Sequence, residues 1–208
     1  DEPLSNLDAK LRNQMRAEII KLREKIDTTF VYVTHDQVEA MTLGDRIVIM
    51  RDGFIQQIGT PQEVFNHPAN LFVAGFIGTP QMNFFDATLS KKGDKYVATV
   101  QGADFELPAE KQAALKNMSN VPTNVVVGVR PVHIHLSETG IPAEVDVSEL
   151  MGSELHLHVN SNGKDIVIVV PTTDIDLNAV HGSHKKVAYS FRPELMHFFD
   201  KETEKNLF

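Results

Sequence analysis

The second part of this 208-residue chain consists of short runs of alternating or β-branched residues that follow one another closely. Such runs predict β-strands, and many short strands in succession close on one another in small barrels. Only residues 108–118, which begin with Pro108 and are rich in Ala, Lys and Glu, are typical of a helix in this region. We therefore predict a β-rich barrel over residues 81–208, with strands at 84–90, 95–101, 123–129, 132–137, 143–150, 154–160, 164–170, 186–191 and 195–199.

Residues 1–80 have a different pattern, which is typical of an α/β layer. Apolar residues recur every three or four positions over residues 7–26 and predict an amphipathic helix. Ser5 and Asp8 are spaced as a capping box at its start. The run TFVYVT at 29–34 is β-branched and aromatic at consecutive positions, which favours a strand covered on both faces.

A second helix is predicted to begin at Asp36 and to end at Gly44, with Glu39 in the reciprocal capping position. The dipeptide Asp52-Gly53 accepts the positive φ angles of a tight hairpin turn. We expect the boundary between the two parts to lie between residues 80 and 81. The remaining predicted elements of the first part are hairpin strands at 46–51 and 54–58 and short helices at 61–66 and 70–77.

Composition excludes several classes of protein. With 42% hydrophobic residues, the chain has enough apolar material for a core, and its formal charge of -8 argues against binding to nucleic acid. The absence of cysteine removes disulfides, thiolate metal sites and a cysteine nucleophile. No apolar run approaches the roughly 20 residues of a membrane helix, so we expect any membrane association to come through a partner.

Two adjacent carboxylates, Asp1 and Glu2, precede a turn and a capped helix in the string DEPLSNLD. In phosphoryl transfer an Asp commonly holds Mg²⁺ near the phosphates, while another group orients the attacking water. Asp1 fits the first role and Glu2 the second. The alternative is that both are solvated charges and that Asp8 is only a helix cap.

His35 lies at the junction of the predicted strand at 29–34 and the helix that follows it. In open α/β sheets, ligands gather outside the carboxyl ends of the strands, so a phosphate contact is one interpretation of His35. The other is an ordinary capping or packing residue.

Three strings carry a family resemblance. DEPLSNLDAKLR resembles the end of a Walker B motif running into the D-loop of ATP-binding-cassette (ABC) ATPases, and VTHDQVEAMTLGDRIVIMRDG resembles their H-loop. IQQIGTPQEVFNHPANLFVAGFIGTPQMNFF resembles the subfamily that drives import of maltose, multiple sugars and glycerol phosphate. Members of that subfamily add a C-terminal regulatory domain of oligonucleotide-binding-like (OB-like) strands, the TOBE type. Residues 1–85 match strongly, and the match is looser in GVRPVHI at 128–134 and SELMGSELHLHV at 148–159.

The resemblance implies an α+β chain in which residues 1–80 are the C-terminal part of a P-loop nucleotide-hydrolase domain and residues 81–208 an OB-like TOBE barrel. It implies that Asp1 is the Walker B aspartate, acting on Mg²⁺ through its water shell, and that Glu2 is the general base for the hydrolytic water. His35 is implied as the switch histidine on the γ-phosphate of ATP. Asp8 is implied as the D-loop aspartate, which communicates between the ATP sites of a dimer.

Parts of the family pattern are missing from the chain. It has no phosphate-binding loop with its Lys, no glutamine loop and no LSGGQ-type signature, and it opens at Asp1 inside a motif. We therefore interpret it as a fragment, inactive alone, of an ATPase that uses ATP and Mg²⁺ to import a sugar or related solute. The alternative is a non-enzymatic module for regulation, small-molecule binding or dimerisation.

The partners implied by the resemblance are a second copy of the ATPase subunit, transmembrane permease subunits and, indirectly, an extracytoplasmic solute-binding protein. The implied location is the cytoplasmic face of the cell membrane, with peripheral attachment through the permease subunits.

Two histidine pairs, His133/His135 and His156/His158, have the spacing that puts both rings on one face of a strand. Zinc requires three or four converging ligands, and the spacing alone does not bring the pairs together. We interpret them as polar strand faces rather than as a metal site.

The missing phosphate loop generates a direct prediction. We expect that the 208-residue chain does not bind Mg²⁺-ATP tightly and does not hydrolyse it, because no cradle of backbone amides is present. Calorimetric titration with Mg²⁺-ATP measures this. Micromolar affinity at a single specific site would show that the interpretation is wrong.

Overall fold

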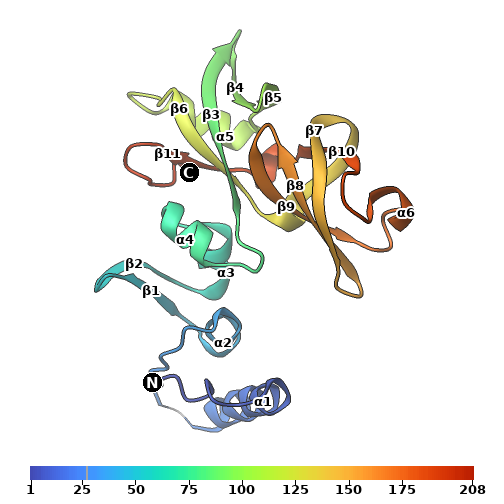
Figure 1. The fold of residues 1–208 in the computed structure, drawn as a ribbon. Helices are drawn as coiled ribbons and strands as arrows, with labels where there is room; N and C mark the ends of the chain where they lie inside the picture. The colour runs from blue at the N-terminus through green and yellow to red at the C-terminus, as the bar shows by residue number, and fades with distance from the viewer. Residues whose placement is uncertain (27) are drawn as a thin grey trace. The chain divides into compact units, whose positions relative to one another are not determined.

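The computed structural model describes residues 1–26 and 28–208 and contains both helices and antiparallel sheets (Figure 1). This confirms the predicted α+β class. The chain divides into two compact units, residues 1–69 and residues 70–208. The expected boundary between residues 80 and 81 falls inside the second unit, and the division into functional domains stays a prediction.

The first helix, α1 (Ala9–Lys25), begins two residues later than predicted. Its cap is Asp8, whose side chain accepts a hydrogen bond from the backbone N–H of Leu11 at 2.9 Å. The predicted capping box was therefore wrong: the Ser5 hydroxyl donates instead to the carbonyl of Glu2 at 3.0 Å, since Ser5 still lies in the preceding turn. None of the residues of α1 is buried, although its apolar positions share one face.

The run TFVYVT does not form the predicted strand. Its residues form no regular secondary structure, no strand of the described chain pairs with them, and Val31 is 89% exposed. A strand needs a neighbour to satisfy its backbone groups, and sequence pattern alone does not supply one. One backbone contact does hold the segment, because Glu2 donates its N–H to the carbonyl of Val33 at 2.7 Å.

The second helix, α2 (Gln37–Leu43), has Asp36 as its N-cap and Gly44 as its C-cap, as predicted. Asp36 accepts from the backbone N–H groups of Val38 and Glu39. The reciprocal cap assigned to Glu39 was wrong. Its carboxylate is buried and accepts from side chains of the preceding segment instead.

A hairpin of β1 (Ile47–Arg51) and β2 (Phe54–Gly59) follows, as predicted from Asp52-Gly53. Both turn residues have positive φ, 51° at Asp52 and 80° at Gly53, which a tight two-residue turn requires. Helix α3 (Pro61–Asn66) then closes the first unit with a complete capping box between Thr60 and Glu63.

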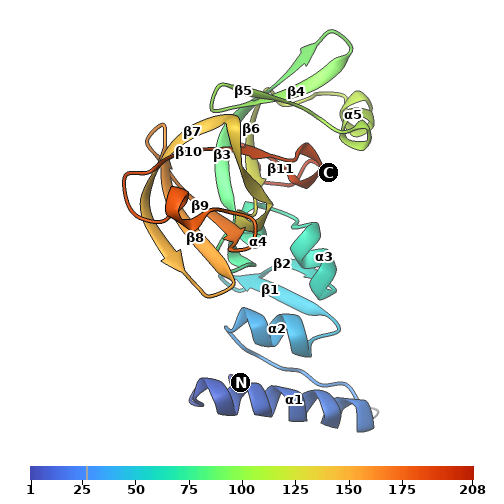
Figure 2. The same ribbon diagram turned by 90° about the vertical axis from the view of Figure 1, so that its right-hand side faces the viewer.

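The second unit contains two antiparallel sheets (Figures 1 and 2). Strand β5 was not predicted, because its four residues carry too short an alternation to be recognised. The five-stranded sheet has the order β11-β6-β3-β4-β5, with bounds β11 (His197–Asp200), β6 (Asn124–Val129), β3 (Asn83–Lys92), β4 (Lys95–Val100) and β5 (Ala103–Glu106). The four-stranded sheet has the order β10-β7-β8-β9, with bounds β10 (Lys186–Phe191), β7 (Ile134–Leu150), β8 (Glu154–Ser161) and β9 (Lys164–Pro171).

Strand β7 replaces two predicted strands, 132–137 and 143–150 (Figure 2). Against β10, the register jumps from Leu136 opposite Tyr189 to Pro142 opposite Ala188, so the residues between form a bulge. Gly140 lies within the bulge, where an added Cβ would come within 2.2 Å of the carbonyl oxygen of Tyr189. Glycine is needed at that position because the two backbones approach so closely.

The larger apolar core of the second unit draws on both sheets. The ring of Phe191 on β10 lies 5.1 Å from the ring centroids of both Phe85 and Phe105, which belong to the other sheet. The side chain of Asn83 on β3 adds a polar link, because it donates to the carbonyl of Val167 at 2.8 Å and accepts from the N–H of Val167 at 2.9 Å. The two sheets are therefore joined by the aromatic contacts in the core and by the hydrogen bonds between Asn83 and the edge strand β9.

Short helices complete the second unit. Within the described residues, every helix falls short of the length and apolarity that crossing a membrane requires. The helices are α4 (Leu71–Phe76), α5 (Ala109–Lys116), α6 (Leu177–Val180), and the 3-10 turns η1 (Pro131–His133) and η2 (Pro193–Leu195).

The core of the second unit can be tested with a matched pair of leucines. Leu157 on β8 is fully buried, whereas Leu150 on β7 is 52% exposed. We expect Leu157→Ala to lower the free energy of unfolding by about 2 to 5 kcal/mol, and Leu150→Ala to change it by less than about 0.5 kcal/mol. Denaturant titration followed by near-ultraviolet circular dichroism measures both, and equal effects would contradict this core assignment.

Candidate functional site

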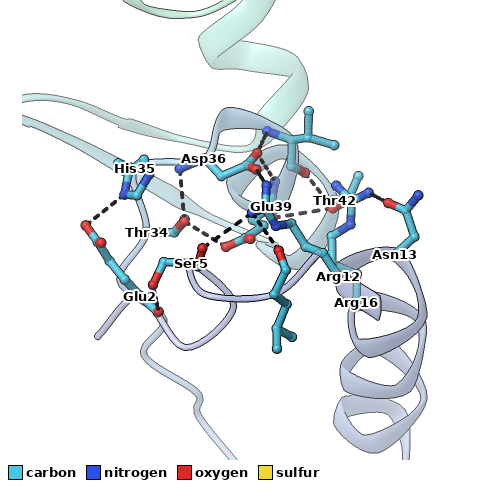
Figure 3. A network of polar contacts seen from close by, with 12 residues as sticks. Glu2, Ser5, Arg12, Asn13, Arg16, Thr34, His35, Asp36, Glu39 and Thr42 are labelled. Atoms are coloured by element: carbon cyan, nitrogen blue, oxygen red, sulfur yellow. Dashed lines mark hydrogen bonds and ion pairs between the residues drawn. The ribbon is translucent and has the colours of Figure 1, made fainter. Parts of the chain in front are cut away.

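Glu2 and His35, which are far apart in the sequence, meet in the first unit (Figure 3). Nδ1 of His35 lies 2.9 Å from Oε1 of Glu2, and the backbone bond from Glu2 to Val33 holds the two segments side by side. Glu2 has a φ of 45°, a left-handed backbone that is uncommon for a residue other than glycine and often occurs at functional sites. The structure thus brings together two of the predicted site residues.

The contact with Glu2 changes the acidity of His35. The hydrogen bond to the Glu2 carboxylate, and then its negative charge, raise the pKa of the imidazole above its ordinary value, with smaller contributions from Asp36 and Glu39. Both side chains are partly in solvent, at 71% exposed for His35 and 44% for Glu2. The pair therefore remains open to a ligand or to water.

The turn before His35 is fixed by a buried carboxylate. Glu39 of α2 accepts hydrogen bonds from the hydroxyl of Thr34 at 2.7 Å and from that of Tyr32 at 3.0 Å. The Thr34 oxygen in turn accepts from the backbone N–H of Asp36 at 3.0 Å (Figure 3). Burial, followed by the bond to Glu39, raises the pKa of Tyr32 to about 12, so Tyr32 keeps its proton and donates.

Asp1 and Asp8 contribute differently. Asp1 is exposed beside Glu2, and Asp8 uses its carboxylate to cap α1. Sequence reasoning missed Tyr32, Thr34 and Glu39 as residues of this site. The position of Glu39, three residues after the cap Asp36, was the available signal, and it was interpreted as local capping rather than as a contact with the preceding segment.

Of the two histidine pairs, only His156/His158 lies on a single strand in the structure. His133 lies in η1 and not in a strand, so it does not share a strand face with His135, and burial lowers its pKa. On β8, His156 lies 3.4 Å from Glu154 and His158 lies 3.2 Å from Glu149. Among residues 1–26 and 28–208, no three His, Asp or Glu side chains are grouped so that they could hold a metal ion.

Surface hollows occur in the second unit. One of about 490 Å³ lies over β7, β8 and β9 and includes Asp146, Glu149, His158 and Asp165 in its lining. A second, of about 360 Å³, lies beside the β4–β5 turn and the bulge of β7. The Glu2–His35 pair lines neither hollow.

Comparison with known proteins identifies the class of the chain. It is 48% identical over 207 residues to the uncharacterized ABC transporter ATP-binding protein YcjV of Escherichia coli (strain 536), a match that covers 98% of this chain and 55% of that protein. It is 43% identical over 212 residues to the oligosaccharides import ATP-binding protein MsmX of Bacillus subtilis (strain 168), covering 98% of this chain and 56% of that protein. The chain belongs to the ABC transporter ATP-binding proteins.

Within that class, two family models define the particular family. Residues 78–134 match the MalK OB fold domain and residues 127–199 match the TOBE domain. The chain therefore corresponds to part of an ABC transporter ATP-binding protein that carries these two domains, as the resemblance predicted. It spans about half the length of the curated relatives that it matches.

The Glu2–His35 pair generates a prediction about acidity. The raised pKa means that the pair stabilises the protonated imidazole at low pH, and that this stabilisation is lost as the pH rises through the folded-state pKa of His35. We expect Glu2→Gln to lower that pKa toward its ordinary value, because the amide carries no charge.

A nuclear magnetic resonance titration of the imidazole signals, with His35→Asn for assignment, gives the midpoint. Glu144→Gln is the matched control, since Glu144 contacts His184 at 2.8 Å in the other unit. An unchanged His35 midpoint in Glu2→Gln would exclude the contact in solution.

Proposed function

We propose that a full-length ATPase containing this chain hydrolyses ATP to drive the import of a sugar or related solute, with Glu2 and His35 in its active site. The observation that carries the proposal is the 2.9 Å contact between Nδ1 of His35 and Oε1 of Glu2, in a chain of this family. ATP hydrolysis needs an acceptor for the proton of the attacking water and a donor to the transferred phosphoryl group. A carboxylate and an imidazole in contact supply both.

Glu2 acts as the general base. Its Oε1 is occupied by His35, so Oε2 is the oxygen that accepts a hydrogen bond from water and then its proton. The side chain of Glu2 points toward His35. Hydrogen bonding from His35 orients the carboxylate before the water arrives, which lowers the cost of reorganisation during the reaction.

His35 acts as the donor to the γ-phosphate. Because Nδ1 faces Glu2, the other ring nitrogen, Nε2, is left to donate to a phosphate oxygen. The raised pKa favours the cationic ring, which attracts the negative phosphoryl group. Thr34 and Glu39 support this role by fixing the turn that presents the ring.

Carboxylate and water oxygens are the ligands that Mg²⁺ prefers, and Asp1 next to Glu2 fits this donor set. Asp1 would hold the ion through its water shell, and Mg²⁺, when bound with ATP, supplies positive charge to the β- and γ-phosphates. Asp8 is proposed to communicate between the ATP sites of a dimer while it caps α1.

The proposed partners follow from the family. We propose a second copy of the ATPase subunit, transmembrane permease subunits and an indirect link to an extracytoplasmic solute-binding protein. The attachment would be peripheral, at the cytoplasmic face of the membrane through the permease subunits. MsmX, by its name, imports oligosaccharides, which supports a sugar as the cargo.

The general-base role of Glu2 can be tested in the full-length protein. We expect Glu2→Gln to reduce ATP turnover on the order of 10² to 10⁴-fold while nucleotide binding persists, because the amide keeps the shape but does not accept the proton. Steady-state hydrolysis and equilibrium binding of ATP are measured together.

The control for that variant is Glu18→Gln, which removes an exposed carboxylate of α1 that forms a salt bridge with Lys21 of the same helix. It should keep normal turnover. A Glu2→Gln protein that retains most of its activity would remove Glu2 from the proposed role.

A further inference from the structure

Arg12, in the first turns of α1, lies between the segments that carry Glu2 and His35 (Figure 3). Its Nη2 donates to the backbone carbonyl of Leu7 at 3.1 Å and lies 3.5 Å from that of Ser5. Its Nη1 reaches Oδ2 of Asp36 at 3.5 Å. The side chains of Arg12 and Asp36 are 32% and 25% exposed, so the ion pair is partly shielded from water.

These contacts form part of a closed circuit of hydrogen bonds and ion pairs that includes the Glu2–His35 contact. On one side, Ser5 donates both its hydroxyl and its backbone N–H to the carbonyl of Glu2. On the other side, Asp36 directly follows His35 and caps α2. The Glu2–His35 contact completes the circuit, so Arg12 is linked to both members of the pair without touching either.

The chemistry of this position suits arginine. A guanidinium presents several donors in one rigid plane, so it can bind carbonyl oxygens on one side and a carboxylate on the other at the same time. A lysine ammonium is a point charge that binds one side well but does not hold two segments at a fixed separation.

We infer that Arg12 is a positioning residue for the proposed active site: it holds the segment that follows Glu2 against the start of α2 and thereby keeps Glu2 and His35 in contact. The inference rests on the proposed function for the meaning of the pair. The positioning itself is a property of this chain and is measured without ATP.

The charges around His35 allow a positioning effect of Arg12 to be distinguished from an effect of its charge. Glu2, Asp36 and Glu39 all favour its protonated form, and Arg12 partly offsets the charge of Asp36. If Arg12 acted only through its charge, its removal would unmask Asp36 and raise the midpoint of His35. If Arg12 positions the pair, its removal separates Glu2 from His35 and lowers the midpoint.

The experiment is a nuclear magnetic resonance titration of His35 in the complete 208-residue chain and its variants. We expect Arg12→Gln to lower the His35 midpoint, Arg12→Lys to lower it less, and the matched control Arg16→Gln to leave it unchanged. Arg16 lies one turn further along α1 and contacts Asn13 on the same helix. In the Glu2→Gln background, Arg12→Gln should produce no further fall, because the negative charge that the contact brings to His35 is already removed.

Circular dichroism checks that α1 and the sheets persist in each variant, and Arg12→Lys provides the answer if Arg12→Gln does not fold. A midpoint that rises or stays unchanged in Arg12→Gln, or that remains at the original value in Arg12→Lys, would overturn the positioning role. Neither result would affect the role of Glu2 in turnover, which is measured separately in the full-length protein.

Discussion

The burial of two sheet faces against each other is the constraint on which the second unit depends. Phe191 illustrates it, because this one ring contacts Phe85 and Phe105 of the opposite sheet and also Tyr189 of its own strand. Aromatic rings bury a large apolar area and gain from edge contacts at these separations. The first unit is different. Its helix α1 has no buried residue, and Val31 of the following segment is almost fully exposed, so local hydrogen bonds carry more of its organisation.

The site in the first unit is built on hydrogen bonds, some of them local and some between segments far apart in the sequence. Glu39 fixes the turn, Asp36 starts the helix, and one backbone bond from Glu2 to Val33 sets the two segments side by side. A hydrogen bond between neutral groups contributes only about 0.5 to 1.5 kcal/mol, and one to a charged group such as the Glu39 carboxylate about 1.5 to 3 kcal/mol. The geometry of the pair therefore depends on their acting together, which a closed ring of contacts allows.

Sequence reasoning succeeded at several local interactions, although the local capping roles assigned to Ser5 and Glu39 were wrong. The Asp52-Gly53 turn and the cap at Asp36 involve residues only a few positions apart, and the structure contains them. It failed where a distant partner decides. The segment 29–34 has the pattern of a strand but no neighbouring strand, and β7 runs through a bulge that the pattern divided into two strands.

At the candidate site, too, the chemical types of the residues were predictable, but the contacts between distant segments were not. The chemical types of Asp1, Glu2 and His35 suggested phosphoryl transfer, and the family resemblance supplied their roles, which stay predictions. The contact between Glu2 and His35 could not be read from their spacing, because it depends on the path of the chain between them. The contacts of Arg12 could not be predicted for the same reason. In the helical pattern, Arg12 is one of several charged residues on the solvent face.

Asn83 has a consequence for how copies of the protein meet. Strand β9 is at the edge of its sheet, and a free edge offers unpaired backbone groups to which another chain can add a strand. At Val167 both groups are already taken, because the amide of Asn83 imitates the backbone of a neighbouring strand. A single side chain thus occupies the backbone groups in the middle of this edge, so that a strand from another chain cannot pair with Val167 without displacing Asn83.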